Sequence, residues 1–152
     1  MAATVSRPRR CATRWPNAAF AVAALVLASC ASTAIPAHPR TTDPVIGVAP
    51  RGALGDVLTA DGMTVYVYTQ DRPRETVCYD ICAMNWPPLL VTHTPTLNHA
   101  FPDRAFGAVT RRDGTKQLTY KDLPLYLYIE DPPGTDQANG QDVDHQWFVV
   151  KP

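Results

Sequence analysis

The chain contains one pattern of residues twice, and this duplication constrains its fold more than any other feature. Residues 55–62 match 107–114 at an offset of 52, with Gly, Val, Asp and Gly in common. Residues 63–71 match 123–131 at an offset of 60, and a tryptophan follows in each copy. This alignment gives the second copy eight additional residues, 115–122. A repeat of this length indicates one supersecondary unit per copy, which is too small to bury a core alone.

Both copies have the pattern of β-structure. Asp61-Gly62 and Asp113-Gly114 are typical hairpin turns, because glycine accepts a positive φ and aspartate bonds to its own backbone. Residues 65–70 and 125–130 then alternate strictly between aliphatic and tyrosine or polar side chains. The predicted fold class is all-β, a compact and mostly antiparallel domain built from two tandem pseudo-symmetric repeats.

Two further elements are expected around these strands. The eight additional residues predict an extra strand at 116–120 in the second copy, and 81–86 predicts a single helical turn. Each alternating segment ends near a proline, which cannot donate to a sheet ladder. We place the β-repeat domain at 52–152, with repeat one at 55–90 and repeat two at 107–150.

The first 30 residues have the pattern of an export signal. Four arginines precede an uncharged apolar run at 18–29, whose 12 residues are too few for a spanning helix of about 20. The run ends in Leu27-Ala28-Ser29-Cys30, which resembles the bacterial lipobox. That resemblance implies a lipoprotein signal peptide at 1–29 and a lipid attached to Cys30. An ordinary signal peptide that happens to end in cysteine is the alternative.

A flexible tether and an acidic domain follow this signal. Residues 30–51, which begin with the lipidated cysteine, are small, polar and proline-rich. Removal of 1–29 takes four arginines and no acidic group, which leaves 10 basic against 14 acidic residues and a net charge of about −4. We therefore expect a cell-envelope protein that is lipid-anchored to a membrane, faces the periplasm or cell exterior, and binds no nucleic acid.

Two motifs resemble a known bacterial family. Residues 66–71 and 126–131 both fit Y-x-(F/W/Y)-x-x-D, with Tyr66, Tyr68 and Asp71 in one copy and Tyr126, Tyr128 and Asp131 in the other. Together with Cys-x-x-x-Cys, Asn-Trp-Pro-Pro-Leu and Asp-Gly-Thr-Lys-Gln, they are similar to predicted lipoproteins known as the secreted repeat of unknown function. The resemblance covers about residues 47–151. It implies an exported β lipoprotein with no established role and carries no catalytic residue set.

The cysteine pair Cys78 and Cys82 has three interpretations. An even number of thiols in an oxidising compartment favours a structural disulfide. A redox-active pair is the second, although the spacing differs from C-x-x-C and Asp80 would raise the thiol pKa. Two ligands of a metal or haem are the third, although no second cysteine pair or His-x-x-x-His accompanies them.

The motif residues also have two interpretations. The paired tyrosines form either an aromatic face that stacks a planar or sugar-like ligand beside a carboxylate, or structural contacts across the sheet in which each aspartate caps the following proline turn. Duplication favours the structural interpretation, and Trp86 and Trp147 are expected to pack in the core.

Remaining polar residues provide weaker candidates. The acidic stretch 136–144 lacks the pattern of a calcium loop and is expected to be a solvated loop. His93, His99 and His145 form a metal site only if the fold gathers them.

These observations favour a non-catalytic binding or interaction module. The chain has no Gly-x-Ser-x-Gly, no His-Glu-x-x-His and no serine after Ser32. We expect no enzyme and no cofactor, with an envelope protein or a small ligand as the partner. The alternative is a periplasmic redox or metal/haem carrier that uses the cysteines and histidines.

Overall fold

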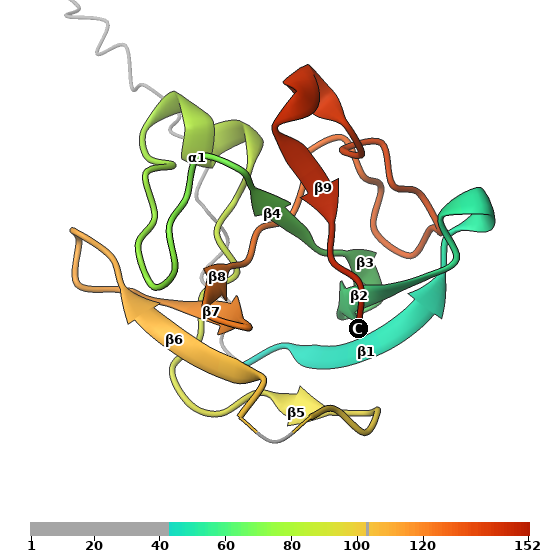
Figure 1. Cartoon of the computed structure of the whole chain (residues 1–152), viewed down its shortest axis with the longest axis horizontal. Coiled ribbons are helices and arrows are strands. Elements are labelled where there is room, and N and C mark those ends of the chain that lie inside the picture. The colour runs from blue at the N-terminus through green and yellow to red at the C-terminus, as the bar shows by residue number, and fades with distance from the viewer. Residues whose placement is uncertain (1–42, 103) are drawn as a thin grey trace, which may run out of the picture. The chain divides into compact units, whose positions relative to one another are not determined.

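The computed structural model describes residues 43–102 and 104–152 (Figure 1). The predicted signal peptide at 1–29, the predicted lipidation site Cys30 and the predicted tether up to residue 42 lie outside the described residues. Residues 45–50, which we also expected in the tether, instead form a strand of the domain. The elements are β1 (Val45–Pro50), η1 (Gly52–Leu54), β2 (Asp56–Ala60), β3 (Met63–Thr64), β4 (Tyr66–Tyr68), α1 (Ile81–Asn85), β5 (Thr96–Leu97), β6 (Phe106–Thr110), β7 (Lys116–Tyr120), β8 (Leu123–Pro124), η2 (Val143–His145) and β9 (Trp147–Val149).

The all-β class is confirmed. Three sheets have the strand orders β3-β2-β1-β5, β6-β7-β8 and β4-β9, and all their pairings are antiparallel except the one between β1 and β5. The predicted single helical turn is α1. No helix in the described part of the chain is long and apolar enough to cross a membrane.

The register of the two main hairpins corrects the repeat alignment. Ile46 pairs with Ala60 in β1–β2, and Phe106 pairs with Tyr120 in β6–β7, so equivalent residues stand 60 apart throughout. The offset of 52 is therefore wrong. The strand predicted at 116–120 exists as β7, but it is the counterpart of β2 and not an addition.

Turn chemistry explains why the alignment failed. The tight turn after β2 is Asp61-Gly62, and its counterpart after β7 is Lys121-Asp122, where both residues have a positive φ without a glycine. Asp113-Gly114 instead lies in the earlier turn, between β6 and β7. Two Asp-Gly pairs that occupy different turns thus looked equivalent in the sequence.

The two copies interlock at the centre of the fold. Tyr66 and Tyr126 form an antiparallel bridge, in which each backbone amide donates to the carbonyl of the other residue, at 2.9 and 3.0 Å. β4 of the first copy pairs with β9 of the second, and Tyr126 of the second pairs with Pro88 of the first. Each copy therefore completes the sheet of the other (Figure 1).

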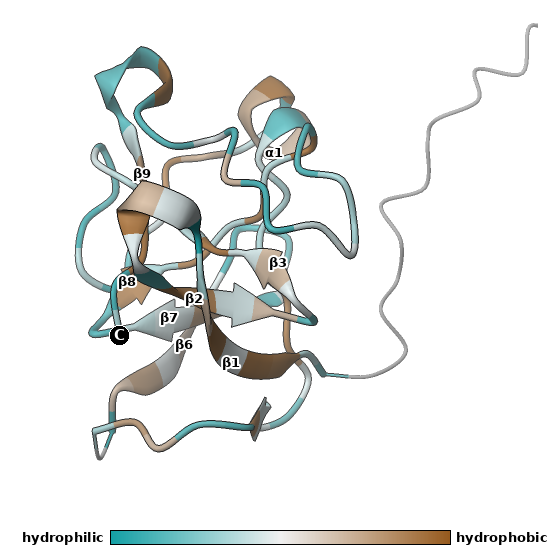
Figure 2. Ribbon diagram, turned by 90° about the vertical axis from the view of Figure 1, so that its right-hand side faces the viewer, coloured by the Kyte–Doolittle hydropathy of each residue, from teal (hydrophilic) through white to brown (hydrophobic). Residues whose placement is uncertain are grey.

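The core has an aliphatic and an aromatic part. The hairpins bury aliphatic side chains such as Ile46, Leu58, Leu118 and Leu125, in one cluster. The second cluster is aromatic and gathers around the bridged tyrosines; it contains Tyr66, Tyr126, Trp86, Trp147 and Cys78. In Figure 2 the hydrophobic colour is strong along β1, while many connecting loops are hydrophilic.

Because the copies exchange strands, we expect neither to fold alone. A fragment of residues 43–104 should give a poorly dispersed amide NMR spectrum, because its buried aromatic face has no cover. Mixing it with a fragment of residues 105–152 should restore the dispersed spectrum of the intact domain. A dispersed spectrum of either fragment by itself would contradict the exchange of strands.

Candidate functional site

Two crossed hydrogen bonds join the motif residues of the two copies. The Tyr66 hydroxyl donates to Asp131 Oδ2, and the Tyr126 hydroxyl donates to Asp71 Oδ2, each at 2.6 Å. Both tyrosine side chains are fully buried, and both aspartates are buried beside them. The structure thus brings the tyrosine of one motif to the aspartate of the other.

Each aspartate also accepts a backbone amide from the loop that follows it. Asp71 Oδ1 accepts the amide of Val77, and Asp131 Oδ1 accepts the amide of Asn139, both at 2.8 Å. The capped amides lie six and eight residues after the aspartates, beyond the proline turn that the sequence suggested. Each carboxylate therefore binds a tyrosine of the other copy and the loop that follows it in its own copy.

Burial and hydrogen bonding shift the pKa values of these groups. Burial raises the pKa of Asp71 and of Asp131, and the hydroxyl bond from the opposite tyrosine works against that rise. Burial, and then the bond to the carboxylate, raises the pKa of Tyr66 and of Tyr126 far above the usual value. At neutral pH both hydroxyls are therefore protonated donors.

Beside these pairs, four aromatic rings form a continuous stack. Trp86 and Trp147 lie parallel with their centroids 3.9 Å apart, Tyr68 stacks on Trp147 at 4.2 Å, and Tyr128 stacks on Trp86 at 4.1 Å. The stack alternates between the copies, so both contribute to every interface in it. The tryptophans are buried, as expected, and the terminal tyrosines are half-buried.

This arrangement limits what the tyrosines offer to a ligand. Of the four motif tyrosines, the first of each copy is enclosed in the core, and Tyr66 packs edge-on against Trp86. Only Tyr68 and Tyr128 reach solvent, at opposite ends of the stack. The four motif tyrosines therefore do not form the single exposed aromatic face that would stack a planar ligand.

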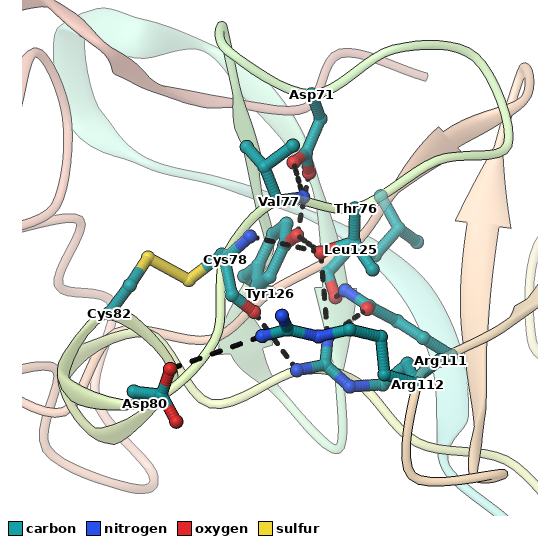
Figure 3. The surroundings of a disulfide bond; sticks show 11 residues. Asp71, Thr76, Val77, Cys78, Asp80, Cys82, Arg111, Arg112, Leu125 and Tyr126 are labelled. Carbon is teal, nitrogen blue, oxygen red and sulfur yellow. Dashed lines mark hydrogen bonds and ion pairs between the residues drawn. A yellow bond between two sulfur atoms is a disulfide. The ribbon is translucent and has the colours of Figure 1, made fainter.

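The predicted disulfide between Cys78 and Cys82 is present, with the two Cα atoms 5.2 Å apart (Figure 3). Cys78 is fully buried, and its carbonyl accepts a hydrogen bond from Arg111 at 2.9 Å. The Tyr79 ring lies 4.4 Å from the Arg111 guanidinium and 3.6 Å from that of Arg112. The disulfide, with these contacts, holds the loop that carries α1 against the second copy.

The histidines and the acidic loop residues do not form a metal-binding cluster in the described part of the chain. No three His, Cys, Asp or Glu side chains come together as a metal site within residues 43–102 and 104–152. His93 bonds to Asp43 and Thr92, His145 bonds to Asp142, and His99 packs on Phe101. The structure does not gather the three histidines into one site.

Sequence reasoning missed two buried arginines. Arg111 donates to Gln117 Oε1 at 2.6 Å, and Arg51 donates from Nε to Thr64 Oγ1 at 2.7 Å. Both guanidinium groups also bind backbone carbonyls. Each works against the rise in the pKa of the other copy's aspartate, Arg111 at Asp71 and Arg51 at Asp131. The signal was available, because the two arginines stand 60 residues apart and a constant offset would have aligned them.

Removal of either crossed hydroxyl should destabilise the domain. For Tyr66→Phe and Tyr126→Phe we expect a loss of about 1.5–3 kcal/mol at neutral pH, the usual value of a hydrogen bond to a charged group. A carboxyl group with a raised folded pKa costs stability as the pH rises through that pKa, and the hydroxyl bond reduces this cost. The difference from the wild type should therefore shrink as the pH falls through the aspartate pKa.

Urea titration between acid and neutral pH measures this effect. Tyr68→Phe is the matched control, because Tyr68 stacks on Trp147 through its ring and should change the stability by less than about 0.5 kcal/mol. Equal losses in all three variants would show that the crossed bonds have no special weight.

Loss of the disulfide should have a local effect on the structure. The double variant Cys78→Ser and Cys82→Ser should lose about 2 kcal/mol, since a loop this short adds little chain entropy to the unfolded state. Hydrogen exchange should increase at α1 while the β6–β7 hairpin keeps its protection. A complete loss of folding would assign the disulfide a larger role than the crossed pairs.

Comparison with known proteins supplies the family. A family model described as a secreted repeat of unknown function matches residues 51–90 and 107–151. No curated protein and no solved structure matches the chain. The two matched regions contain the crossed motif residues of both copies, and together they make up more than half of the chain. The chain therefore belongs to the family of the secreted repeat of unknown function.

Proposed function

We propose that this secreted protein is a lipid-anchored, non-catalytic interaction module of the cell envelope. The observation that carries the proposal is a group of exposed apolar side chains around α1. Ile81, Met84 and Ile129 are 74%, 66% and 60% exposed. Apolar groups gathered on a surface in this way mark sites that bind another apolar surface.

The contacts of α1 support a single surface. Ile81 and Met84 are three residues apart on the helix, so they point to the same side. The amide of Ile129 donates to the carbonyl of Asn85 at 3.0 Å, which places Ile129 at the end of that helix. Figure 2 shows hydrophobic colour on part of α1 in the upper part of the view. We call Ile81, Met84 and Ile129 the α1 patch.

The rigidity of the α1 patch favours binding. The disulfide closes the loop before and within α1, so little conformational entropy remains to be lost when a partner binds. The motif tyrosines and aspartates support a non-catalytic role, because they bond to one another inside the fold. The partner that fits is an envelope protein with an apolar surface of its own.

The sequence supports the anchor. The lipobox-like Leu27-Ala28-Ser29-Cys30 follows a signal-like run, and a chain with two or three acyl groups binds a membrane firmly. In this proposal the residues between Cys30 and β1 (Val45–Pro50) connect the lipid anchor to the folded domain.

Site-specific cross-linking in intact cells tests the proposal. A photoreactive amino acid at position 84 should give a discrete adduct, and Ile81→Asp should abolish it. Leu97, an exposed apolar residue away from α1, provides the matched control position and should give no adduct. Cys30→Ala should release the protein from the membrane fraction and remove the adduct with an envelope partner. The same adducts at 84 and 97, or a Cys30→Ala protein that stays in the membrane, would contradict the proposal.

A further inference from the structure

The two copies differ at one edge of their hairpins. β1 has β2 on one side and β5 on the other, whereas β6 has β7 on one side and is the last strand of its sheet. Within the part of the chain that the structure describes, no strand pairs with the outer edge of β6. In the first copy the equivalent edge, that of β1, is covered by β5 (Figure 1).

The outer edge of β6 presents backbone donors and acceptors. The backbone amide of Leu118 donates to the carbonyl of Leu89 on the far side of β7. The backbone N–H of Leu118 is therefore directed away from β6. Ala108 is its cross-strand partner, and in such a pair both residues direct their N–H and C=O groups outward. The backbone groups of Phe106, two residues before Ala108, are also directed outward. The counterpart of Phe106 in the first copy is Ile46, whose outward carbonyl accepts the Asn98 amide at 2.9 Å.

A pair of equivalent glycines points to the kind of occupant. A Cβ on Gly47 would lie 2.3 Å from the side-chain oxygen of Asn98, which follows β5, so the Asn98 side chain occupies the space that a larger residue at 47 would fill. Gly107 is the counterpart of Gly47, yet the nearest described atom to a Cβ there is Thr119 Oγ1, at 3.0 Å. No described side chain covers Gly107 as Asn98 covers Gly47.

The sequence of β6 lacks the usual protection of an edge strand. Its five residues, Phe-Gly-Ala-Val-Thr, include no charge and no proline. A cavity of about 350 Å³ lies between the β6–β7 hairpin, which lines it with Phe106, Gly107, Ala108, Lys116 and Leu118, and residues 91–95. The residues of β6 themselves therefore do not prevent an added strand.

We propose that β6 binds an extended segment of a partner protein, which adds to the sheet as a parallel strand. β5 shows the chemistry of this segment, because Leu97 lies opposite Ile46 and Asn98 follows over Gly47. The partner segment has an apolar residue opposite Phe106, followed by an asparagine over Gly107. A second copy of β6 carries no asparagine and does not supply this side chain. The inference deepens the proposed interaction module and assigns it a second contact.

A peptide taken from the chain itself is the probe. The heptapeptide Thr-Pro-Thr-Leu-Asn-His-Ala, the sequence of residues 94–100, should bind the mature full-length protein in detergent with a saturable rise in fluorescence anisotropy. A peptide with alanine in place of asparagine should bind at least about tenfold more weakly. Amide NMR shifts on binding should centre on β6.

Two variants of β6 test the site without removing a buried side chain. Gly107→Ala should weaken peptide binding by at least about tenfold, because the added Cβ takes the space of the asparagine. Ala108→Pro should do the same by removing an outward N–H, a change that edge strands tolerate. Both should keep a cooperative thermal unfolding transition. Gly47→Ala is the matched control: it should destabilise the free protein, because Asn98 is already in place there.

Each outcome bears on the inference. No binding up to about 1 mM peptide, or binding that survives both β6 variants, overturns it. Self-association that Ala108→Pro abolishes, with no peptide binding, assigns the edge to a second copy and also overturns it. The Ile81→Asp variant separates this inference from the proposed function, because it should lose the cross-link at α1 and keep peptide binding.

Discussion

The fold depends on the backbone bridge between Tyr66 and Tyr126. Each residue donates its amide to the other, and each side chain extends into the opposite half to reach an aspartate. A pair of tyrosines at a pseudo-twofold centre thus fixes the position of both strands and both loops. Since all four polar partners are buried, the loss of one leaves a buried group without its bond, which costs more than the bond itself contributes. The motif is duplicated because the centre needs both copies.

The differences between the copies are where function is expected. The first copy has the disulfide, the helix α1 and the covering strand β5, whereas the second has a longer loop after Asp131 and an uncovered β6. The symmetric centre accounts for stability and leaves these additions free to differ. Both proposed contact surfaces depend on these differences: the α1 patch combines α1 of the first copy with Ile129 of the second, and the β6 edge is uncovered only in the second copy.

Sequence patterns predicted the local structure well and the connections between copies less well. Strict alternation located β4, and an even number of cysteines predicted the disulfide, because both depend on residues close in the chain. In the second copy the alternating residues 125–130 form only the isolated bridge at Tyr126 and no strand. The hydrogen bonds from each tyrosine to the aspartate of the other copy depend on how two similar units pack together. A local sequence pattern does not contain that information. The buried arginines were missed because the offset of 52 did not align Arg51 with Arg111. That offset arose because Lys121-Asp122 forms a tight turn without the glycine that usually indicates one. The open edge of β6 appears only when the two hairpins are compared in three dimensions.

The exchange of strands has a consequence for the order in which a secreted chain matures. Synthesis produces the amino-terminal copy first, yet β4 receives its neighbour only when β9, near residue 149, has been made. Until then the tyrosine strand and the aromatic side chains of the first copy lack the cover of the second copy. The disulfide joins cysteines four residues apart and can form before that point, while the tryptophan stack cannot. We therefore expect an early covalent step within one half and a late closing step that involves both, and the late step buries the aromatic surface.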